Sequence, residues 1–290
     1  MRSALCPMRG SVMSRVYRAL EKAEEEKKKK QEEPSINVFE DIEVLKKEKP
    51  VLKIHAEKRI GPGLPPKEEV PLLMVPPRSF AEEEFRKLKT KIFLRLPNPP
   101  HSILVTSAVP REGKTMVAVN LAMAISKEIH KKTILIDGDI RKPGIHLGKS
   151  RTSKGLSDYL SDGVPLSEIL TNSEAENLQV ITAGTQTEKS SELIGSPRMG
   201  EFLKAVAECG ENAYLVIDSS PVIPTTEPTL LSSMVDGIIL VIMADQTPKE
   251  YVQRALKSID RQKIIGIVLN QIEFNPSHDY ARYYYQYYRK

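Results

Sequence analysis

Near the middle of the chain, Gly113, Lys114 and Thr115 have the types and the order that can hold a phosphorylated ligand. A glycine allows close approach of the backbone, a lysine reaches the β- and γ-phosphates, and a threonine hydroxyl can ligate Mg²⁺. The aliphatic run Ile103–Val105 precedes them and a helix-forming stretch, Met116–Ile129, follows. A strand, a tight loop and a helix in this order turn backbone N–H groups toward phosphate, so the pattern predicts a nucleotide site.

The loop departs from the usual pattern at one position. The first glycine of G-x-x-x-x-G-K is replaced by Ala108. A GKT triplet also occurs by chance in loops, but the flanking strand and helix disfavour that interpretation. We expect nucleotide contacts along the whole loop, from Ala108, Pro110, Arg111, Glu112, Gly113, Lys114, Thr115 and Met116.

Two aspartates follow a second aliphatic run, Thr133–Ile136. Residues two apart on an extended backbone face the same way, so Asp137 and Asp139 project from one side of the strand's carboxyl end. Open α/β sheets bind their ligands at that end. Two unpaired carboxylates would repel each other, and Mg²⁺ is the expected counterion. The alternative is a polar turn in which Arg141 neutralises one aspartate.

A third aspartate has the setting of a Walker B element. Asp218 comes directly after the hydrophobic run Tyr214–Ile217. In phosphoryl-transfer proteins an aspartate at the end of such a strand ligates or orients Mg²⁺. Asp218 is therefore a further candidate metal ligand.

These residues require strands alternating with helices. The predicted strands are Ile103–Val105, Thr133–Ile136, Leu178–Thr182, Tyr214–Ile217, Gly237–Met243 and Ile264–Leu269. The predicted helices are Ser79–Ile92, Met116–Ile129, Glu192–Gly210 and Lys249–Arg261, with a short helix near Gly155–Leu160 inside a polar insert over 144–176. Alternation of this kind implies right-handed crossovers, so we expect an α/β fold with a mostly parallel sheet flanked by helices.

Composition divides the chain into three parts. Residues 1–78 contain a helix-forming stretch, Met13–Gln31, and then a proline- and charge-rich linker that cannot bury much surface. Met13 reads as a more natural start than Met1. The folded domain is predicted over 79–273, and residues 274–290 form a tail.

Charge and cysteine content exclude other classes of protein. A net charge of +5 with 28% charged residues is too mild to argue for nucleic acid. Cys6 and Cys209 are far apart in sequence and suggest neither a disulfide framework nor a metal site, which favours a reduced cytoplasmic setting. No apolar run approaches the roughly 20 residues that cross a bilayer. We expect a soluble protein.

The C-terminal tail is rich in tyrosine. Six of the ten tyrosines fall in the last eleven residues, at Tyr280, Tyr283, Tyr284, Tyr285, Tyr287 and Tyr288. Burying all six would leave their hydroxyls in need of partners. A sticky aromatic tail and a stacking platform for single-stranded nucleic acid are alternatives, but no nucleic-acid-binding domain accompanies the tail. A tail that offers its hydroxyls as phosphoryl acceptors fits best.

Four ordered elements of this chain resemble the bacterial tyrosine kinases of capsule and exopolysaccharide systems, of the stand-alone cytoplasmic type. They are SAVPREGKT (107–115), ILIDGDIRKP (134–143), LVIDSSP (215–221) and the tyrosine cluster. The resemblance runs from about Ser79 to the C-terminus and implies a P-loop ATPase fold related to the MinD and ParA ATPases. Those relatives carry a lysine where this chain has Val109, which favours the kinase branch.

The resemblance implies roles for the residues already singled out. Lys114 and Thr115 would hold the phosphates and Mg²⁺ of ATP. Asp137 and Asp218 would complete a metal shell together with Thr115. Asp139 is the candidate base or positioning group for the incoming tyrosine hydroxyl.

The resemblance also implies roles for residues outside this cluster. Arg141 would orient phosphates or carboxylates, and Asn270 matches the place where relatives contact adenine. Glu83, Arg86 and Lys89 lie three apart on one face of the predicted helix, which by itself is compatible with an exposed charge ladder. They match the family's E-x-x-R-x-x-R helix, which assembles rings. Lysine at position 89 loses the bidentate pairing of arginine.

The implied function is autophosphorylation of the tail tyrosines by Mg-ATP, regulating polymerisation and export of a surface polysaccharide. The implied partners are a transmembrane chain-length protein that activates the kinase, a tyrosine phosphatase and further copies of the chain in a ring, with no nucleic acid. Such a protein would lie in the cytoplasm, at the inner face of the membrane through its partner. Alternatives are a MinD/ParA-like ATPase switch without kinase activity, and a nucleotide-sensing adaptor phosphorylated by another kinase.

Overall fold

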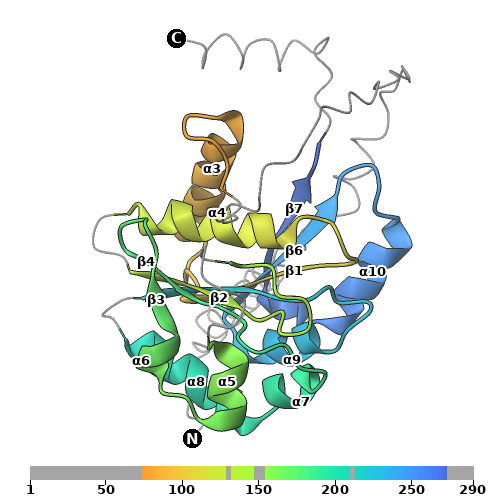
Figure 1. Ribbon diagram of the computed structural model, residues 1–290. Helices are drawn as coiled ribbons and strands as arrows, with labels where there is room; N and C mark the ends of the chain where they lie inside the picture. The colour runs from red at the N-terminus through yellow and green to blue at the C-terminus, as the bar shows by residue number, and fades with distance from the viewer. Residues whose placement is uncertain (1–73, 129–131, 147–153, 210–212, 273–290) are drawn as a thin grey trace, which may run out of the picture. The chain divides into compact units, whose positions relative to one another are not determined.

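The structure is a computed structural model that describes residues 74–128, 132–146, 154–209 and 213–272 (Figure 1). Within these residues a seven-stranded sheet has the order β3-β4-β2-β5-β1-β6-β7. Its neighbouring strands are parallel except for the pair β3 and β4, which confirms the predicted mostly parallel α/β sheet. The strands are β1 (Ser102–Ser107), β2 (Thr133–Asp137), β3 (Leu170–Asn172), β4 (Leu178–Ile181), β5 (Tyr214–Asp218), β6 (Gly237–Met243) and β7 (Ile264–Asn270).

The central strands are buried on both faces, which explains their continuous aliphatic sequences. On β1, Leu104 belongs to the core on one face, while Ile103 and Val105 belong to the core on the other. Ile217 and Val216 of β5 divide in the same way. Alternation of side chains along each strand thus supplies two hydrophobic layers that helices must cover.

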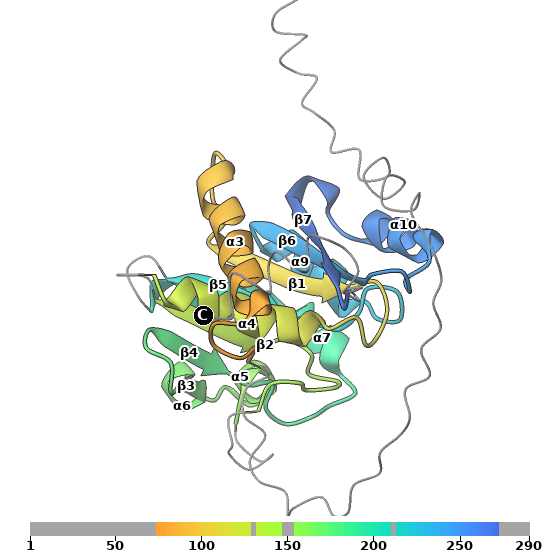
Figure 2. The same cartoon turned by 90° about the horizontal axis from the view of Figure 1, so that it is seen from above.

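Helices cover both faces of the sheet (Figures 1 and 2). Helices α3 (Phe80–Arg95) and α4 (Lys114–Ser126) pack on one face. The other face carries α5 (Leu156–Asp162), α6 (Leu166–Ile169), α7 (Ser190–Ile194), α8 (Pro197–Glu208), α9 (Glu227–Met234) and α10 (Lys249–Ser258), and a 3-10 turn, η1 (Arg261–Lys263), follows α10. No helix in the described part of the chain combines the length and apolar composition needed to cross a membrane.

Helix α3 begins with a side-chain cap. Ser79 is its N-cap, and the Ser79 Oγ accepts a hydrogen bond from the Glu82 N–H at 3.1 Å. Such a bond satisfies one of the otherwise unpaired N–H groups of the first turn. The predicted N-terminal helix, most of the linker and the tyrosine tail lie outside the described residues. The predicted limits of the folded domain therefore stay predictions.

Several parts of the secondary structure differ from the sequence prediction. The helix predicted over Glu192–Gly210 is two helices, α7 and α8, because Pro197 lacks the N–H that a continuing helix needs and instead starts α8. The polar insert contains the edge strand β3, which at three residues is too short to show a period. Helices α6 and α9 were not predicted.

The strand order decides which residues meet at the carboxyl edge of the sheet. Strand β5 lies between β1 and β2. Asp218, at the end of β5, is paired in register with Asp137, at the end of β2. On the other side of β5, Asp218 is paired in register with Val105 of β1, two residues before that strand ends and its loop begins. The loop over 108–113, called the phosphate loop from here on, and the carboxylates of Asp137 and Asp218 therefore come from three adjacent strands.

Gly155, before α5, allows a close backbone contact that we expect to be intolerant of substitution. A Cβ at this position would lie 2.3 Å from the Thr182 carbonyl oxygen and 2.4 Å from the Gly184 nitrogen. We expect Gly155→Ala to lower the free energy of unfolding by roughly 1–3 kcal/mol, as overpacking does. Gly200→Ala is the control, because a Cβ there meets nothing within 4 Å and lies in helix α8. It should stabilise by roughly 0.5–1 kcal/mol. Urea denaturation measures both, and equal effects would contradict the expected backbone contact.

Candidate nucleotide and phosphoryl-transfer site

The loop after β1 presents its backbone N–H groups to a ligand. Arg111 and Gly113 both have left-handed backbone conformations, with φ of 72° and 87°. Gly113 is the N-cap of α4, which begins at Lys114. Within the described residues, the N–H groups of 111–115 donate to no protein acceptor. Successive unpaired donors at a helix start form an anion-binding concavity, which fits phosphate oxygens.

Lys114 lies among carboxylates. Its Nζ is 3.2 Å from Asp139 Oδ2 and 3.7 Å from Asp218 Oδ1, and its side chain is 14% exposed. Burial lowers the pKa of Lys114, but the charges of Asp218 and Asp139 outweigh it and hold the pKa above its ordinary value. Lys114 is therefore a cation at neutral pH, placed where it can meet a phosphate.

Thr115 and Asp218 form a pair beside this lysine. The Thr115 hydroxyl donates to Asp218 Oδ2 at 2.6 Å. Asp218 is fully buried, and its Oδ1 has no hydrogen-bond partner among the described residues. A buried carboxylate oxygen without a hydrogen bond is unfavourable unless a ligand satisfies it. Together with the threonine hydroxyl, this oxygen fits a divalent cation of the Mg²⁺ type.

Asp137 lies beside Asp218 but is more fully bonded. Its Oδ2 accepts the N–H groups of Gly144 at 3.0 Å and Ile145 at 2.9 Å, and its Oδ1 accepts that of Asp139 at 3.1 Å. Burial first, and then the charge of Asp218, raise the pKa of Asp137 to about 7 against these hydrogen bonds. Burial also raises the pKa of Asp218 to about 6, although Lys114 and Thr115 lower it. A bound cation would reduce the electrostatic repulsion between these two carboxylates.

The described residues do not by themselves complete a metal site. Among the described residues, no group of three or more His, Cys, Asp and Glu side chains is arranged to hold a metal ion. Mg²⁺ is commonly bound by one or two carboxylates plus substrate phosphates and water rather than by a full protein cage. The residues present fit that mode, in which Thr115 and Asp218 bind a cation that arrives with the phosphates.

Asp139 has one oxygen held by the backbone and one directed at Lys114. Its Oδ1 accepts the Lys142 N–H at 3.1 Å, and its Oδ2 forms the ion pair with Lys114. The side chain is largely buried, at 5% exposure of the residue. A carboxylate fixed in this way, next to a lysine predicted to bind phosphate, can orient a hydroxyl or accept its proton.

Two predicted site residues form no ion pair or hydrogen bond with the charged side chains of this cluster in the described part of the chain. Arg141 is exposed, and in the described part of the chain its side chain enters no ion pair, so the cation beside Asp139 is Lys114 rather than Arg141. Asn270, at the end of β7, donates from Nδ2 to the Glu112 carbonyl at 2.8 Å. Asn270 thus contacts the phosphate loop itself. Its predicted contact with adenine stays a prediction.

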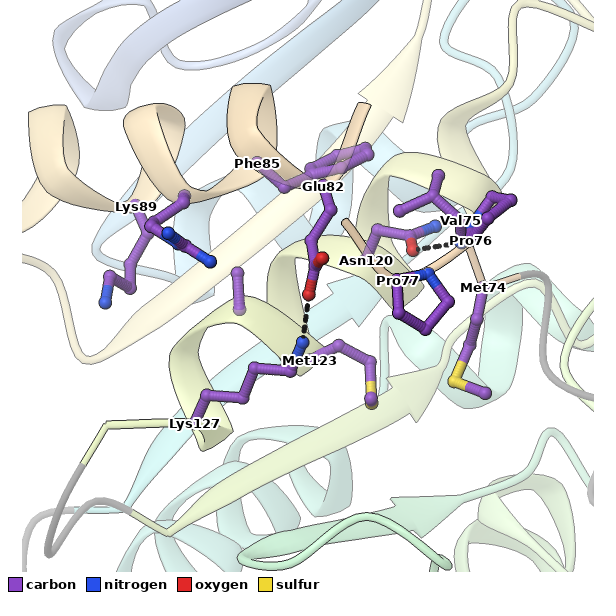
Figure 3. Close-up of a pocket in the computed structure, with 12 residues that line it drawn as sticks. Met74, Val75, Pro76, Pro77, Glu82, Phe85, Lys89, Asn120, Met123 and Lys127 are labelled. Carbon is purple, nitrogen blue, oxygen red and sulfur yellow. Dashed lines mark hydrogen bonds and ion pairs between the residues drawn. The ribbon is translucent and has the colours of Figure 1, made fainter. Parts of the chain in front are cut away.

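The three charged residues predicted to mediate assembly do not share one interaction. Glu83 pairs with Arg86 at 3.1 Å within α3, whereas Lys89 pairs with Glu128 beyond the end of α4 at 3.0 Å. Arg86 and Lys89 also line a groove of about 520 Å³ between α3 and α4 (Figure 3). The Glu82–Lys127 ion pair lies across this groove. A role in ring assembly stays a prediction.

Sequence reasoning missed the side-chain contacts that hold the phosphate loop. Glu112 was expected only as a member of the loop, but its carboxylate is buried and accepts the Val109 N–H at 2.7 Å. Thr247, after β6, donates its hydroxyl to Glu112. Gln271 Nε2 donates to the Arg111 carbonyl at 3.2 Å. The one local signal for such contacts was the presence of a charged residue, Glu112, inside a tight loop.

Comparison with known proteins agrees with this geometry. The ParA family, described as "NUBPL iron-transfer P-loop NTPase", matches residues 98–286. The putative tyrosine-protein kinase CapB of Staphylococcus aureus is 30% identical over 212 residues, which cover 72% of this chain and 92% of CapB. The succinoglycan biosynthesis transport protein ExoP of Rhizobium meliloti (strain 1021) is 28% identical over 71% of this chain, which spans 27% of ExoP.

A solved structure shows the same architecture. The kinase domain of the Escherichia coli tyrosine kinase ETK superposes with a TM-score of 0.65 at 25% identity. The match covers 74% of this chain and 85% of that domain. The described fold therefore has a counterpart in a tyrosine kinase domain.

Proposed function

The chain belongs to the bacterial tyrosine-protein kinase family of ParA-related P-loop NTPases, and from this membership we propose that it transfers the γ-phosphoryl group of Mg-ATP to tyrosines of its own C-terminal tail. The acceptors would be Tyr280, Tyr283, Tyr284, Tyr285, Tyr287 and Tyr288. The observation that supports this most is the contact of Lys114 with Asp139 beside the Thr115–Asp218 pair. This contact supports the proposal because it joins the cation proposed to bind phosphate to the proposed proton acceptor.

Each residue of the cluster has one role in the proposed reaction. The N–H groups of 111–115 and Lys114 hold the phosphates, and Thr115, Asp218 and Asp137 hold or orient the cation. When bound, Mg²⁺ neutralises charge on the phosphate oxygens. Once phosphate draws the Lys114 ammonium away, Asp139 Oδ2 is free to take the proton of the tyrosine hydroxyl. The phenolic oxygen forms the new bond to phosphorus, the bond to the bridging oxygen breaks, and ADP leaves.

We place this activity in the control of a surface polysaccharide. ExoP is named for succinoglycan transport, and CapB is a putative tyrosine kinase. The proposed partners are a transmembrane activator, a tyrosine phosphatase and further copies of this chain in a ring. Each phosphotyrosine adds about −1.5 to −2 charges at pH 7. Several of them on one tail would repel the acidic metal site and neighbouring tails, which offers a physical route to disassembly.

Asp139→Asn is expected to separate nucleotide binding from transfer. The amide cannot accept the hydroxyl proton, so we expect tail phosphorylation to slow by roughly 10²–10⁴-fold. ATP affinity should stay within a few-fold, because Asp139 contacts Lys114 and not the loop N–H groups. The measurement is mass spectrometry of the tail peptide after the purified protein is incubated with Mg-ATP, beside a titration with a fluorescent ATP analogue.

The same experiment distinguishes the rival functions. Phosphate on the tail in wild type, lost with EDTA and slowed in Asp139→Asn, supports the autokinase. An unmodified tail despite ATP hydrolysis, also in the presence of the activator's cytoplasmic segment, would favour the ATPase switch. Phosphorylation that is equally fast in Asp139→Asn would contradict the role of Asp139, and loss of tail phosphate in Lys114→Met would count against phosphorylation by another kinase.

A further inference from the structure

The buried carboxylate of Glu112 connects the phosphate loop to a second loop. Glu112 is 1% exposed. Its Oε2 accepts the Val109 N–H at 2.7 Å, within the loop. Its Oε1 accepts the Met243 N–H at 3.3 Å and the hydroxyl of Thr247. Met243 ends β6, and Thr247 lies in the turn that leads to α10.

This turn is itself tightly organised around the carboxylate. The Met243 N–H also points to Thr247 Oγ1, at 3.1 Å, and the Thr247 N–H donates to the Met243 carbonyl at 3.1 Å. Between them, Asp245 has a left-handed backbone with φ of 58°. Glu112 therefore closes a small network in which the turn and the phosphate loop hold each other.

The chemistry of the network requires a carboxylate. Three donors converge on Glu112, namely two N–H groups and one hydroxyl. A carboxylate is acceptor-only and can satisfy all three, whereas an amide would present an N–H₂ group to at least one donor. Burial of this charge is tolerable only with such bonds.

The network sets the direction of the loop's peptide groups. The carbonyls of Arg111 and Glu112 accept hydrogen bonds from Gln271 and Asn270. These carbonyls and the Glu112 side chain are held from β6, β7 and the residues that follow them, while the N–H groups of 111–115 donate to no acceptor among the described residues. A loop prepared in this way binds phosphate without first reorganising.

We propose that Glu112, together with Thr247, is a positioning residue for the nucleotide. It holds the phosphate loop in its binding conformation by anchoring it to the turn between β6 and α10. The inference rests on the proposed function in taking ATP as the ligand, but it requires no phosphoryl transfer.

The test is ATP binding and kinetics in the full chain. We expect Glu112→Gln and Thr247→Val each to weaken binding of a fluorescent ATP analogue about tenfold, the effect of losing one hydrogen bond to a charged group. KM for ATP should rise by more than kcat falls. Thr247→Ser keeps the hydroxyl and should retain wild-type affinity. The comparison of Thr247→Val with Thr247→Ser therefore tests the inference even if Glu112→Gln fails to fold.

The matched control is Asp236→Asn. Asp236 Oδ2 also accepts three hydrogen bonds, from the His101 and Ser102 N–H groups and the Ser102 hydroxyl. It connects β1 with β6 at their opposite, amino ends, so its loss should lower thermal stability without changing ATP affinity. Wild-type affinity in Thr247→Val, or equal weakening in Asp236→Asn, would overturn the inference.

Failure of the kinase function would give a different result. If the wild-type protein binds ATP but leaves its tail unmodified, the proposed function fails and the role of Glu112 is still decided by the affinities. If the wild-type protein binds no ATP, both fail.

Discussion

Lys114→Met is expected to abolish ATP binding and to slow tail phosphorylation by at least about 10²–10³-fold, the effect of removing one preorganised charge from a reacting phosphate. It should also destabilise the nucleotide-free protein. Lys114 is the cation within 4 Å of both Asp139 and Asp218 in the described part of the chain. Breaking a buried pair of this kind lowers the free energy of unfolding by roughly 3 kcal/mol. Thermal denaturation and the ATP titration measure both effects.

Lys204→Met is the control for this loss of charge. Lys204 is an exposed lysine of α8, outside the nucleotide site. It should leave ATP affinity, phosphorylation and melting temperature near wild type. ATP binding by Lys114→Met at wild-type affinity would contradict the assignment of this lysine to the phosphates.

Asp218→Asn is expected to have opposite effects on activity and on stability. Removal of a cation ligand should slow phosphorylation by about 10²–10³-fold. The apo protein, however, should become more stable at pH 8, because the amide removes the repulsion between two buried carboxylates. The gain should be on the order of 1 kcal/mol, or about 2–4 °C in melting temperature, since the Lys114 pair is weakened at the same time. Thermal melts without Mg²⁺ or nucleotide measure it.

The stabilisation should depend on pH with a defined sign. Burial raises the pKa of Asp137 to about 7 and that of Asp218 to about 6, from an ordinary value of 3.8. In this window the native state binds more protons than the unfolded state, so the free energy of unfolding falls as the pH rises from about 4 to about 7. At pH 4 the carboxyls of Asp137 and Asp218 are protonated in the native wild-type protein. Asp218→Asn should then lose its advantage and show a flatter pH profile.

The contrast between the two variants provides the decisive comparison. Without Mg²⁺ at pH 8, Lys114→Met should melt below wild type and Asp218→Asn above it. Addition of Mg-ATP should raise the melting temperature of wild type, and it should raise the melting temperature of each variant by less. If Asp218→Asn melts below wild type at pH 8, the repulsion inferred between Asp137 and Asp218 is wrong.

Much of the fold was predictable because its signals are local. The six predicted strands are aliphatic runs that the structure retains, and a strand buried on both faces needs no partner to be recognised. The exceptions have identifiable causes. Pro197 cannot continue a helix from the residues before it and instead begins α8. The strand Leu170–Asn172 is too short to show alternation. Its pairing with β4 depends on a neighbour and not on its own sequence.

The candidate site was predictable as a set of residues but not as a set of contacts. Lys114 and the aspartates follow strand ends, and the carboxyl edge of a parallel sheet gathers such residues. Sequence could not show that Lys114, rather than Arg141, would be the cation beside Asp139. Nor could it show that Asn270 contacts the Glu112 carbonyl, because the two residues are 158 positions apart.

By itself the sequence determined the chemistry available: a phosphate-binding loop, three aspartates at strand ends and a tail of tyrosines. These are properties of residue type and near neighbours along the chain. Only the tertiary structure decided that β5 lies between β1 and β2, which brings Asp218 beside both Asp137 and Thr115. Strand order depends on how crossover helices bury both faces of the whole sheet. The same long-range packing joins Glu112 to Thr247, 135 residues away, and so prepares the phosphate loop.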